Sequence, residues 1–140
     1  MSDRFFLDTN IFVYSFDQTA PAKRKIATEL IRKAHASREG VISYQVAQEF
    51  FNVALRRFTP VMQSHEAQAY LKVVFLPLLN IHSSQTLFLE ALNLHSNHHL
   101  SWYDSLIVAS AIQANCRLLL TEDLQHGRRF GDLQIENPFL

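Results

Sequence analysis

The chain of 140 residues has a single cysteine, Cys116, so no disulfide bond can form within it. It also lacks an excess of either charge, because thirteen basic residues balance thirteen acidic ones. A net charge of zero removes overall attraction as an argument for a polyanionic partner, although a local patch can still bind one. Without any sign of an oxidising compartment, we expect the protein in the cytoplasm.

Long apolar runs are missing too, and no uninterrupted stretch approaches the ~20 residues of a membrane-spanning helix. The first residues are acidic and then strand-like, unlike the basic and then apolar start of a secretory signal. We find no repeat, low-complexity segment or linker. An apolar fraction of 48% and eleven phenylalanines favour a packed core. The sequence therefore predicts one soluble intracellular domain over residues 1–140.

Short apolar runs alternate with amphipathic segments along the whole chain. A short apolar run between polar residues is typical of a buried parallel strand, and apolar residues three and four apart indicate a helix. The pattern predicts an α/β/α domain with a central, mostly parallel sheet of four to five strands flanked by helices. The expected strands are 5–7, 41–43, 78–81, 117–121 and 133–135, and the expected helices are 11–16, 21–37, 45–57, 64–75, 86–95 and 102–114.

Small hydroxyl side chains precede four of these helices. Ser and Thr are favoured there because their side-chain oxygen accepts a hydrogen bond from a backbone N–H group of the first turn. We therefore expect N-caps at Thr19, at Ser43, at Ser83 or Ser84, and at Ser101.

Acidic residues fall near the ends of several elements. Asp8 directly follows the first strand, and Glu49 lies in the helix after the second. Asp104 lies in the first turn of the helix before the fourth strand, and Asp123 follows that strand beside Glu122. In open parallel sheets, ligands bind just outside the carboxyl ends of the strands. Since no acid ends the third strand, we expect the site away from it.

Each acid taken alone also has a purely structural explanation. Asp8 could end its strand in a simple turn, because Asp bonds its own backbone there. Glu49 could belong to a solvated stripe of its helix, and the pair at 122–123 could be ordinary loop carboxylates.

Asp104 argues most strongly for a functional role. Ser101 to Asp104 fits the pattern of a helix start, yet residues 106–114 are apolar nearly all round, as in a central buried helix. An unpaired buried charge is costly, and no Lys or Arg lies nearby in the sequence. Four converging carboxylates would also repel one another unless a cation bound them. Oxygen ligands favour Mg²⁺ or Mn²⁺ over zinc, and such an ion suits phosphodiester hydrolysis.

Four blocks carry a resemblance to a known family: Phe6–Ile11, Gln48–Phe50, Trp102–Ala111 and Leu119–Gly127. In their order and spacing they resemble PIN-domain ribonucleases, in particular VapC-type toxins of prokaryotic toxin–antitoxin pairs. The resemblance implies a parallel sheet flanked by helices and an endoribonuclease site that uses Mg²⁺ or Mn²⁺. It also implies an RNA substrate, a homodimer, and inhibition by a small antitoxin that inserts a segment near the active site.

Residue by residue, the resemblance implies both catalytic and metal-binding roles for four acids. Asp8, Glu49 and Asp104 match the most recognisable positions, and Asp123 matches a more variable fourth one. Glu122 is adjacent and could share or replace that role. Polar positions that orient the carboxylates in such sites are matched by Thr9 or Asn10 and by Thr121.

Two other functions remain open. A phosphotransferase or phosphatase could use Asp8 as nucleophile, although that pattern calls for a second Asp where Asn10 stands. Alternatively, the chain could be a non-catalytic PIN-fold domain that binds RNA or protein. His126 in the loop after the fourth strand could contact phosphate or transfer a proton, and Arg128–Arg129 could grip RNA. A basic stretch at 23–25 could also contact RNA, and Trp102–Tyr103 could stack on a base.

Overall fold

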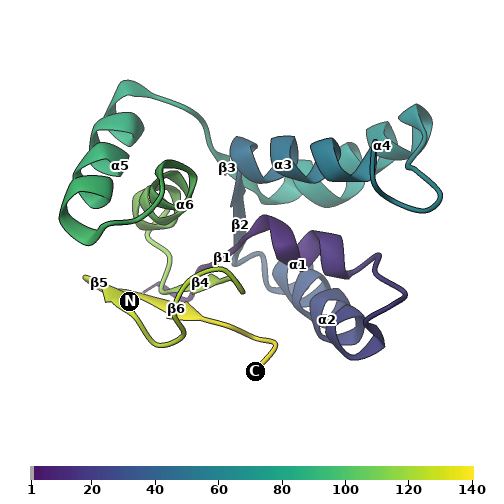
Figure 1. Ribbon diagram of the computed structural model, residues 1–140, viewed down its shortest axis with the longest axis horizontal. Coiled ribbons are helices and arrows are strands. Elements are labelled where there is room, and N and C mark those ends of the chain that lie inside the picture. Colours follow the sequence, from purple (N-terminus) through teal and green to yellow (C-terminus); the bar gives the residue numbers. More distant parts are fainter. Residues whose placement is uncertain (1) are drawn as a thin grey trace.

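Six strands form one sheet in the order β3-β2-β1-β4-β6-β5 in the computed structural model, which describes residues 2–140 (Figure 1). Neighbouring strands are parallel except for the pair β5 and β6. In this register Leu7 at the end of β1 lies beside Leu120 at the end of β4. The strands are β1 (Phe5–Leu7), β2 (Gly40–Ser43), β3 (Leu79–Ile81), β4 (Leu118–Leu120), β5 (Arg129–Phe130) and β6 (Leu133–Glu136).

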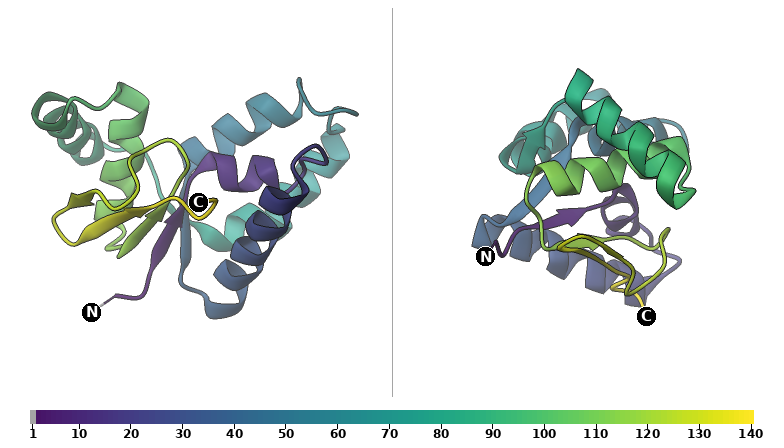
Figure 2. Two further views of the ribbon diagram at one scale, coloured as in Figure 1. Left: turned by 60° about the horizontal axis from the view of Figure 1, so that its bottom comes forward. Right: turned by 90° about the vertical axis from the view of Figure 1, so that its left-hand side faces the viewer.

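Helices cover both faces of the sheet, which confirms the predicted α/β/α arrangement. α5 and α6 lie on one side, while α1 and α2 lie on the other (Figure 2). The helical elements are α1 (Thr9–Tyr14), α2 (Pro21–Ser37), α3 (Tyr44–Ala54), α4 (Ser64–Tyr70), η1 (Leu71–Phe75), η2 (Leu76–Leu78), α5 (Gln85–His98) and α6 (Trp102–Gln113).

The sheet has one strand more than the four to five expected. β5 spans only Arg129 and Phe130, where the sequence predicted no strand, and pairs antiparallel with β6 through a turn at Gly131. Gly131 has a φ of +62°, a left-handed conformation that glycine adopts without strain. So short a strand has no periodicity that a sequence pattern could show.

Several predicted helix boundaries were also wrong. The expected helix 64–75 is two segments, because α4 gives way at Leu71 to a wider π-helical turn, η1. α3 ends at Ala54 rather than at residue 57. α5 continues through the polar residues up to His98 and ends where His99 turns left-handed, with a φ of +58°.

A cluster of aromatic rings joins the helices on one side of the core. Phe75 of η1 lies edge-on to Phe12 of α1, with ring centres 5.0 Å apart, and to Phe50 of α3, at 5.2 Å. Tyr70 stacks on Phe50 at 4.9 Å. All three phenylalanines are fully buried. This packing holds α1 against α3, and it fixes how the first turn of α1 faces the middle of α3.

α6 occupies the centre of the molecule, as its apolar sequence predicts. Its residues from Ser105 to Ala111 are all buried. Across residues 2–140, no helix combines the length and the hydropathy that a membrane-crossing segment requires.

Of the four predicted helix N-caps, two are confirmed and two are not. The Oγ of Ser101 accepts from the N–H of Asp104 at 3.1 Å, and the Oγ of Ser84 accepts from Leu87 at 3.1 Å, which confirms both caps. Ser43 precedes α3, but its side chain makes no capping hydrogen bond. The prediction for Thr19 was wrong, because α2 begins after Ala20 with a proline in its first turn.

Candidate acidic site

Asp8 is the buried centre of the site. Its side chain lies at the carboxyl end of β1 and is 5% exposed. Oδ1 accepts the backbone N–H of Thr9 at 2.7 Å, and Oδ2 accepts the hydroxyl of Thr121 at 2.8 Å. Burial raises the pKa of Asp8 to about 7 in spite of these two hydrogen bonds, with smaller contributions from nearby carboxylates. No basic side chain hydrogen-bonds to this carboxylate among the described residues.

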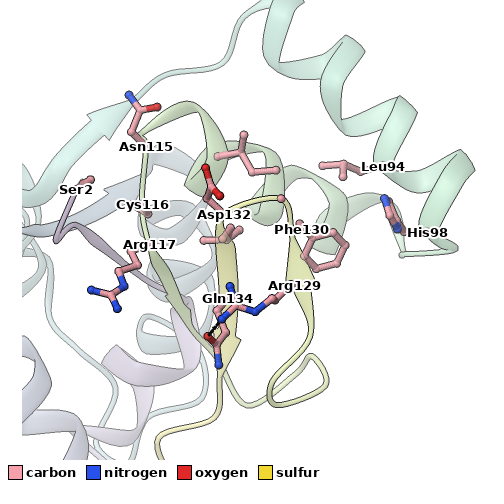
Figure 3. A pocket seen from close by; sticks show the side chains of 13 residues that line it. Ser2, Leu94, His98, Asn115, Cys116, Arg117, Arg129, Phe130, Asp132 and Gln134 are labelled. Carbon is pink, nitrogen blue, oxygen red and sulfur yellow. Dashed lines mark hydrogen bonds between the residues drawn. The ribbon is translucent and has the colours of Figure 1, made fainter.

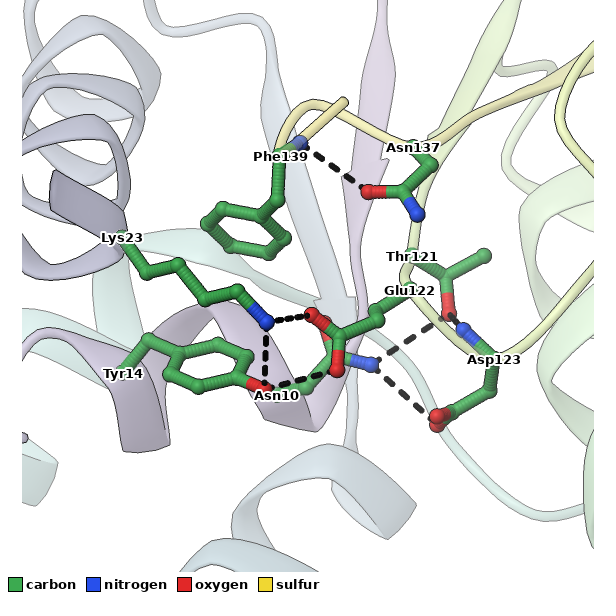
Figure 4. Close-up of polar contacts among 8 residues, drawn as sticks. All are labelled: Asn10, Tyr14, Lys23, Thr121, Glu122, Asp123, Asn137 and Phe139. Carbon is green, nitrogen blue, oxygen red and sulfur yellow. Dashed lines mark hydrogen bonds and ion pairs between the residues drawn. The ribbon is translucent and has the colours of Figure 1, made fainter. Parts of the chain in front are cut away.

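Thr121 and Asn10 connect Asp8 to Asp123. Besides donating to Asp8, the Oγ1 of Thr121 accepts from the backbone N–H of Asp123 at 3.1 Å. The amide Nδ2 of Asn10 donates to Thr121 at 3.4 Å and to Oδ2 of Asp123 at 3.1 Å (Figure 4). A first turn of helix and a loop after β4 are thereby joined around two carboxylates.

Glu49 reaches the same place from α3. Its Oε1 accepts from the hydroxyl of Thr9 and from the Nε2 of Gln45, both at 3.2 Å. Partial burial raises the pKa of Glu49, and the charges of Asp104 and Asp123 raise it further. The hydrogen bond to Gln45 fits the helical-stripe interpretation, but the bond to Thr9 places this carboxylate beside the end of β1.

Asp104 lies in the first turn of α6 and is only half-buried. The expectation of a buried, unpaired charge at this position was therefore wrong, because the buried residues of α6 begin at Ser105. Burial is still the main cause that raises the pKa of Asp104, and the charge of Asp123 adds to it. Among residues 2–140, the buried acid without a basic partner is Asp8.

The sequence left open whether Glu122 or Asp123 is the fourth acid of the site. In the structure these two carboxylates have different partners. The Oε1 of Glu122 accepts the hydroxyl of Tyr14 at 2.6 Å, and its Oε2 pairs with the Nζ of Lys23 at 2.9 Å. The exposed carboxylate of Asp123 instead accepts from the amide of Asn10 (Figure 4). Asp123 acts on the pKa of the other three acids, whereas Glu122 acts on none of them.

The donor set fits a divalent cation that keeps part of its water shell. All candidate ligands are oxygens, the type that Mg²⁺ and Mn²⁺ prefer. The Oδ1 of Asn10 is buried with no hydrogen-bond partner, which suits contact with an ion or its water. Within residues 2–140, no three His, Cys, Asp or Glu side chains are close enough to enclose an ion directly. Mg²⁺ commonly binds through one or two carboxylates and several waters, so the geometry is compatible with it.

Comparison with known proteins identifies the family. The family model described as PIN domain matches residues 5–130. The chain belongs to the PIN domain family. No curated protein is similar enough in sequence to match it.

Solved structures show where else this PIN fold occurs. The chain is similar to a toxin–antitoxin complex from Klebsiella pneumoniae, with a TM-score of 0.68 and 20% identity, covering 95% of this chain and 96% of that one. It is also similar to VapBC2 from Rickettsia felis bound to a promoter DNA fragment, with a TM-score of 0.60 and 22% identity. That match covers 95% of this chain and 97% of the other. A third similar structure is VapC20 from Mycobacterium tuberculosis, a toxin that cleaves the sarcin–ricin loop, with a TM-score of 0.60 and 17% identity. That match covers 85% of this chain and 91% of the other. At these identities the likeness concerns the fold.

Three side chains that the sequence suggested as RNA contacts instead contact other residues of the domain. The Nδ1 of His126 accepts the backbone N–H of Asn137 at 3.0 Å, so this histidine holds the C-terminal segment. Arg129 donates to Oε1 of Gln134 at 2.9 Å, within the β5–β6 pair. Arg128 lies over the ring of the buried Phe130, 4.7 Å from its centre.

The two aromatic residues before Asp104 differ in their surroundings. Trp102 is half-buried and lies edge-on to Phe88 of α5, at 5.6 Å between ring centres. Tyr103 is 63% exposed next to the acidic group. Of the two, only Tyr103 has a ring free to stack on a nucleotide base.

Tyr14 is a residue that sequence reasoning missed. Its only available signal was spacing, because Asn10 and Tyr14 lie four residues apart and hence on one face of α1. Nothing in the sequence indicated that Lys23 and Glu122 would meet at its hydroxyl.

A cavity of about 850 Å³ lies elsewhere in this PIN domain (Figure 3). Its lining includes Asn115 and Arg117, just before β4, and Gly131 in the β5–β6 turn. These residues mark the amino edge of the sheet, whereas Asp8 and Asp123 follow the carboxyl ends of β1 and β4. None of the four acids lines the cavity, so the acidic site is a separate surface.

Proposed function

We propose that this PIN domain is an endoribonuclease that depends on Mg²⁺ or Mn²⁺ and hydrolyses phosphodiester bonds of RNA. One observation carries the proposal. A carboxylate buried at the end of β1 is hydrogen-bonded to hydroxyl and amide donors, faces no base, and lies near the carboxylates of Glu49 and Asp123. Such an arrangement is unfavourable for an isolated protein but is suited to holding a divalent cation.

Each acid has a role in this proposal. Asp8 and Asp104 are the principal ligands, and Glu49 and Asp123 complete the group by holding the ion or its water. When bound, the ion supplies an activated water and neutralises charge on the scissile phosphate. The chain's own polar groups keep the carboxylates in place: Thr121 orients Asp8 and Asn10 orients Asp123.

We further propose that the protein is the toxin of a toxin–antitoxin pair. Supporting this are the four sequence blocks and the similarity of the fold to structures described as toxin–antitoxin complexes. A small antitoxin is the expected protein partner, a homodimer the expected assembly, and the cytoplasm the expected location.

Replacing the buried carboxylate by its neutral isostere tests the nuclease function. We expect Asp8→Asn to abolish Mn²⁺-dependent cleavage of RNA and to relieve growth inhibition when the protein is produced without an antitoxin. The fold should survive, because an amide can still accept the N–H of Thr9 or the hydroxyl of Thr121. Cleavage is measured with purified protein and end-labelled RNA, and folding by circular dichroism.

Asp3→Asn is the matched control, since Asp3 is exposed at the other end of the same segment and should tolerate the change. Retained cleavage by Asp8→Asn would contradict the mechanism. A wild-type protein that neither binds Mn²⁺ nor cuts RNA would favour a non-catalytic binding domain instead.

A further inference from the structure

Two consecutive residues after β4 are each held by the same face of α1. Asn10 donates to the carboxylate of Asp123 at 3.1 Å, and Tyr14 donates to the carboxylate of Glu122 at 2.6 Å (Figure 4). Asn10 and Tyr14 lie one helical turn apart, so their side chains project from α1 in the same direction. The two carboxylates reach different partners in Figure 4, and only that of Asp123 raises the pKa of Asp8, Glu49 and Asp104.

Lys23 closes this arrangement from the first turns of α2. Its Nζ donates to Oε2 of Glu122 at 2.9 Å and to the hydroxyl of Tyr14 at 3.2 Å, and it lies 4.6 Å from the centre of the Tyr14 ring. Phe139 packs edge-on against the same ring, at 5.0 Å. Lys23, Tyr14 and Glu122 thus bind one another pairwise and connect α2, α1 and the loop.

The location of this contact is unusual within the described part of the chain. Residues 2–140 contain two ion pairs, of which Glu29–Arg32 lies within α2. Lys23–Glu122 is the one that joins separate elements, across 99 positions of sequence. The side chains of Lys23 and Glu122 are 39% and 29% exposed, and exposed ion pairs contribute little to stability. The pair links the loop after β4 to α2.

We propose that Lys23, Tyr14 and Glu122 form a clamp that positions Asp123 for metal binding; this inference rests on the nuclease function proposed above. Asp123 is exposed and has two direct attachments, its side-chain bond to Asn10 and its backbone bond to Thr121. The adjacent residue, Glu122, is fixed by two donors on the outer side. Holding Glu122 restricts the backbone of residue 123 and keeps its carboxylate directed at the acidic group.

The clamp residues are positioning residues, so their removal should affect metal affinity more than turnover. Removing a group that orients a metal ligand typically weakens metal affinity or activity about 10- to 100-fold. For Tyr14→Phe and for Lys23→Met we expect the dissociation constant for Mn²⁺ to rise about tenfold, at the lower end of that range. Once Mn²⁺ is saturating, kcat for RNA should return to within about twofold of wild type, because the carboxylates themselves remain.

The test combines Mn²⁺ calorimetry with hydrogen exchange of the peptide that spans residues 121–128. Both variants should exchange faster in this peptide. In a Tyr14→Phe, Glu122→Gln double variant the loss of Mn²⁺ affinity should be smaller than the sum of the losses in the two single variants, because both changes break the same contact. Lys25→Met is the matched control, an exposed lysine two residues along α2 for which both readouts should equal wild type. Lys23→Arg, which keeps the charge, should recover most of the affinity.

Three outcomes are decisive. Unchanged Mn²⁺ affinity and unchanged exchange in Tyr14→Phe would overturn the clamp. A raised KM for RNA with unchanged Mn²⁺ affinity in Lys23→Met would overturn it as well, because Lys23 would then contact RNA. Weakened Mn²⁺ binding in the clamp variants of a protein that cuts no RNA would support the clamp while contradicting the nuclease proposal. If Tyr14→Phe or Lys23→Met fails to fold, Glu122→Gln takes its place. Its Mn²⁺ affinity and hydrogen exchange are then measured in the same way.

Discussion

At the scale of single residues, the site depends on where each carboxylate points. The sequence predicted Asp8 correctly as a strand-end acid, because an acid directly after a buried strand must lie at the sheet edge. It could not predict that Asp104 is half-buried. The periodic pattern of a helix shows which side faces the core, but not how deeply the first turn is buried. The choice between Glu122 and Asp123 depended on Tyr14 and Lys23, which are distant in sequence.

The buried state of Asp8 predicts a pH dependence of stability in metal-free protein. Its pKa is raised to about 7 in the folded protein from 3.8, so the folded state keeps this proton at pH values where the unfolded chain has lost it. Stability from Asp8 is therefore fully present below about pH 4 and is lost as pH rises toward 7. A difference of three units corresponds to up to about 4 kcal/mol.

Urea unfolding of wild type and Asp8→Asn, each in a chelator, measures this effect. Between pH 4 and pH 8 the free energy of unfolding of wild type should fall relative to that of the variant. Parallel pH profiles for the two proteins would show that Asp8 does not titrate in this range.

At the scale of elements, the alternation of strands and helices was predictable, whereas their ends were not. Buried apolar runs located β1, β2 and β4, and the apolar sequence of α6 placed it in the centre. The two-residue β5 and the π-helical turn η1 follow from pairing and packing with distant segments, which leave no periodic signal.

The serine N-caps provide a prediction at this scale. Ser84→Ala and Ser101→Ala should each lower the free energy of unfolding by about 1 kcal/mol, the usual cost of losing a capping hydrogen bond. Ser43→Ala should be neutral or stabilising, because the buried hydroxyl of Ser43 has no partner to lose. Urea denaturation in the presence of chelator measures all three variants. A loss for Ser43→Ala equal to that of Ser101→Ala would contradict the structure.

At the scale of the whole molecule, α5 carries a group of exposed apolar side chains. Leu89 and Leu92 on the outer side of α5 are 63% and 50% exposed, and Phe88 beside them is 44% exposed. Neighbouring exposed apolar side chains of this size often mark a protein interface. This surface is the candidate contact for the proposed homodimer.

Light scattering of the purified protein should give the mass of a dimer, and Leu89→Glu should shift it toward the monomer. Thr28→Glu, an exposed substitution on α2 across the molecule, is the control that should leave the mass unchanged. A wild-type protein that is monomeric at all concentrations would contradict the homodimer.

We propose that four carboxylates, from the end of β1, from α3, from α6 and from the loop after β4, bind a divalent cation. Calorimetric titration of Mn²⁺ into wild type and into a variant with Asp8, Glu49, Asp104 and Asp123 all changed to their amides tests it directly. We predict saturable binding to wild type and no binding to the variant. Equal binding by the two proteins would contradict the account.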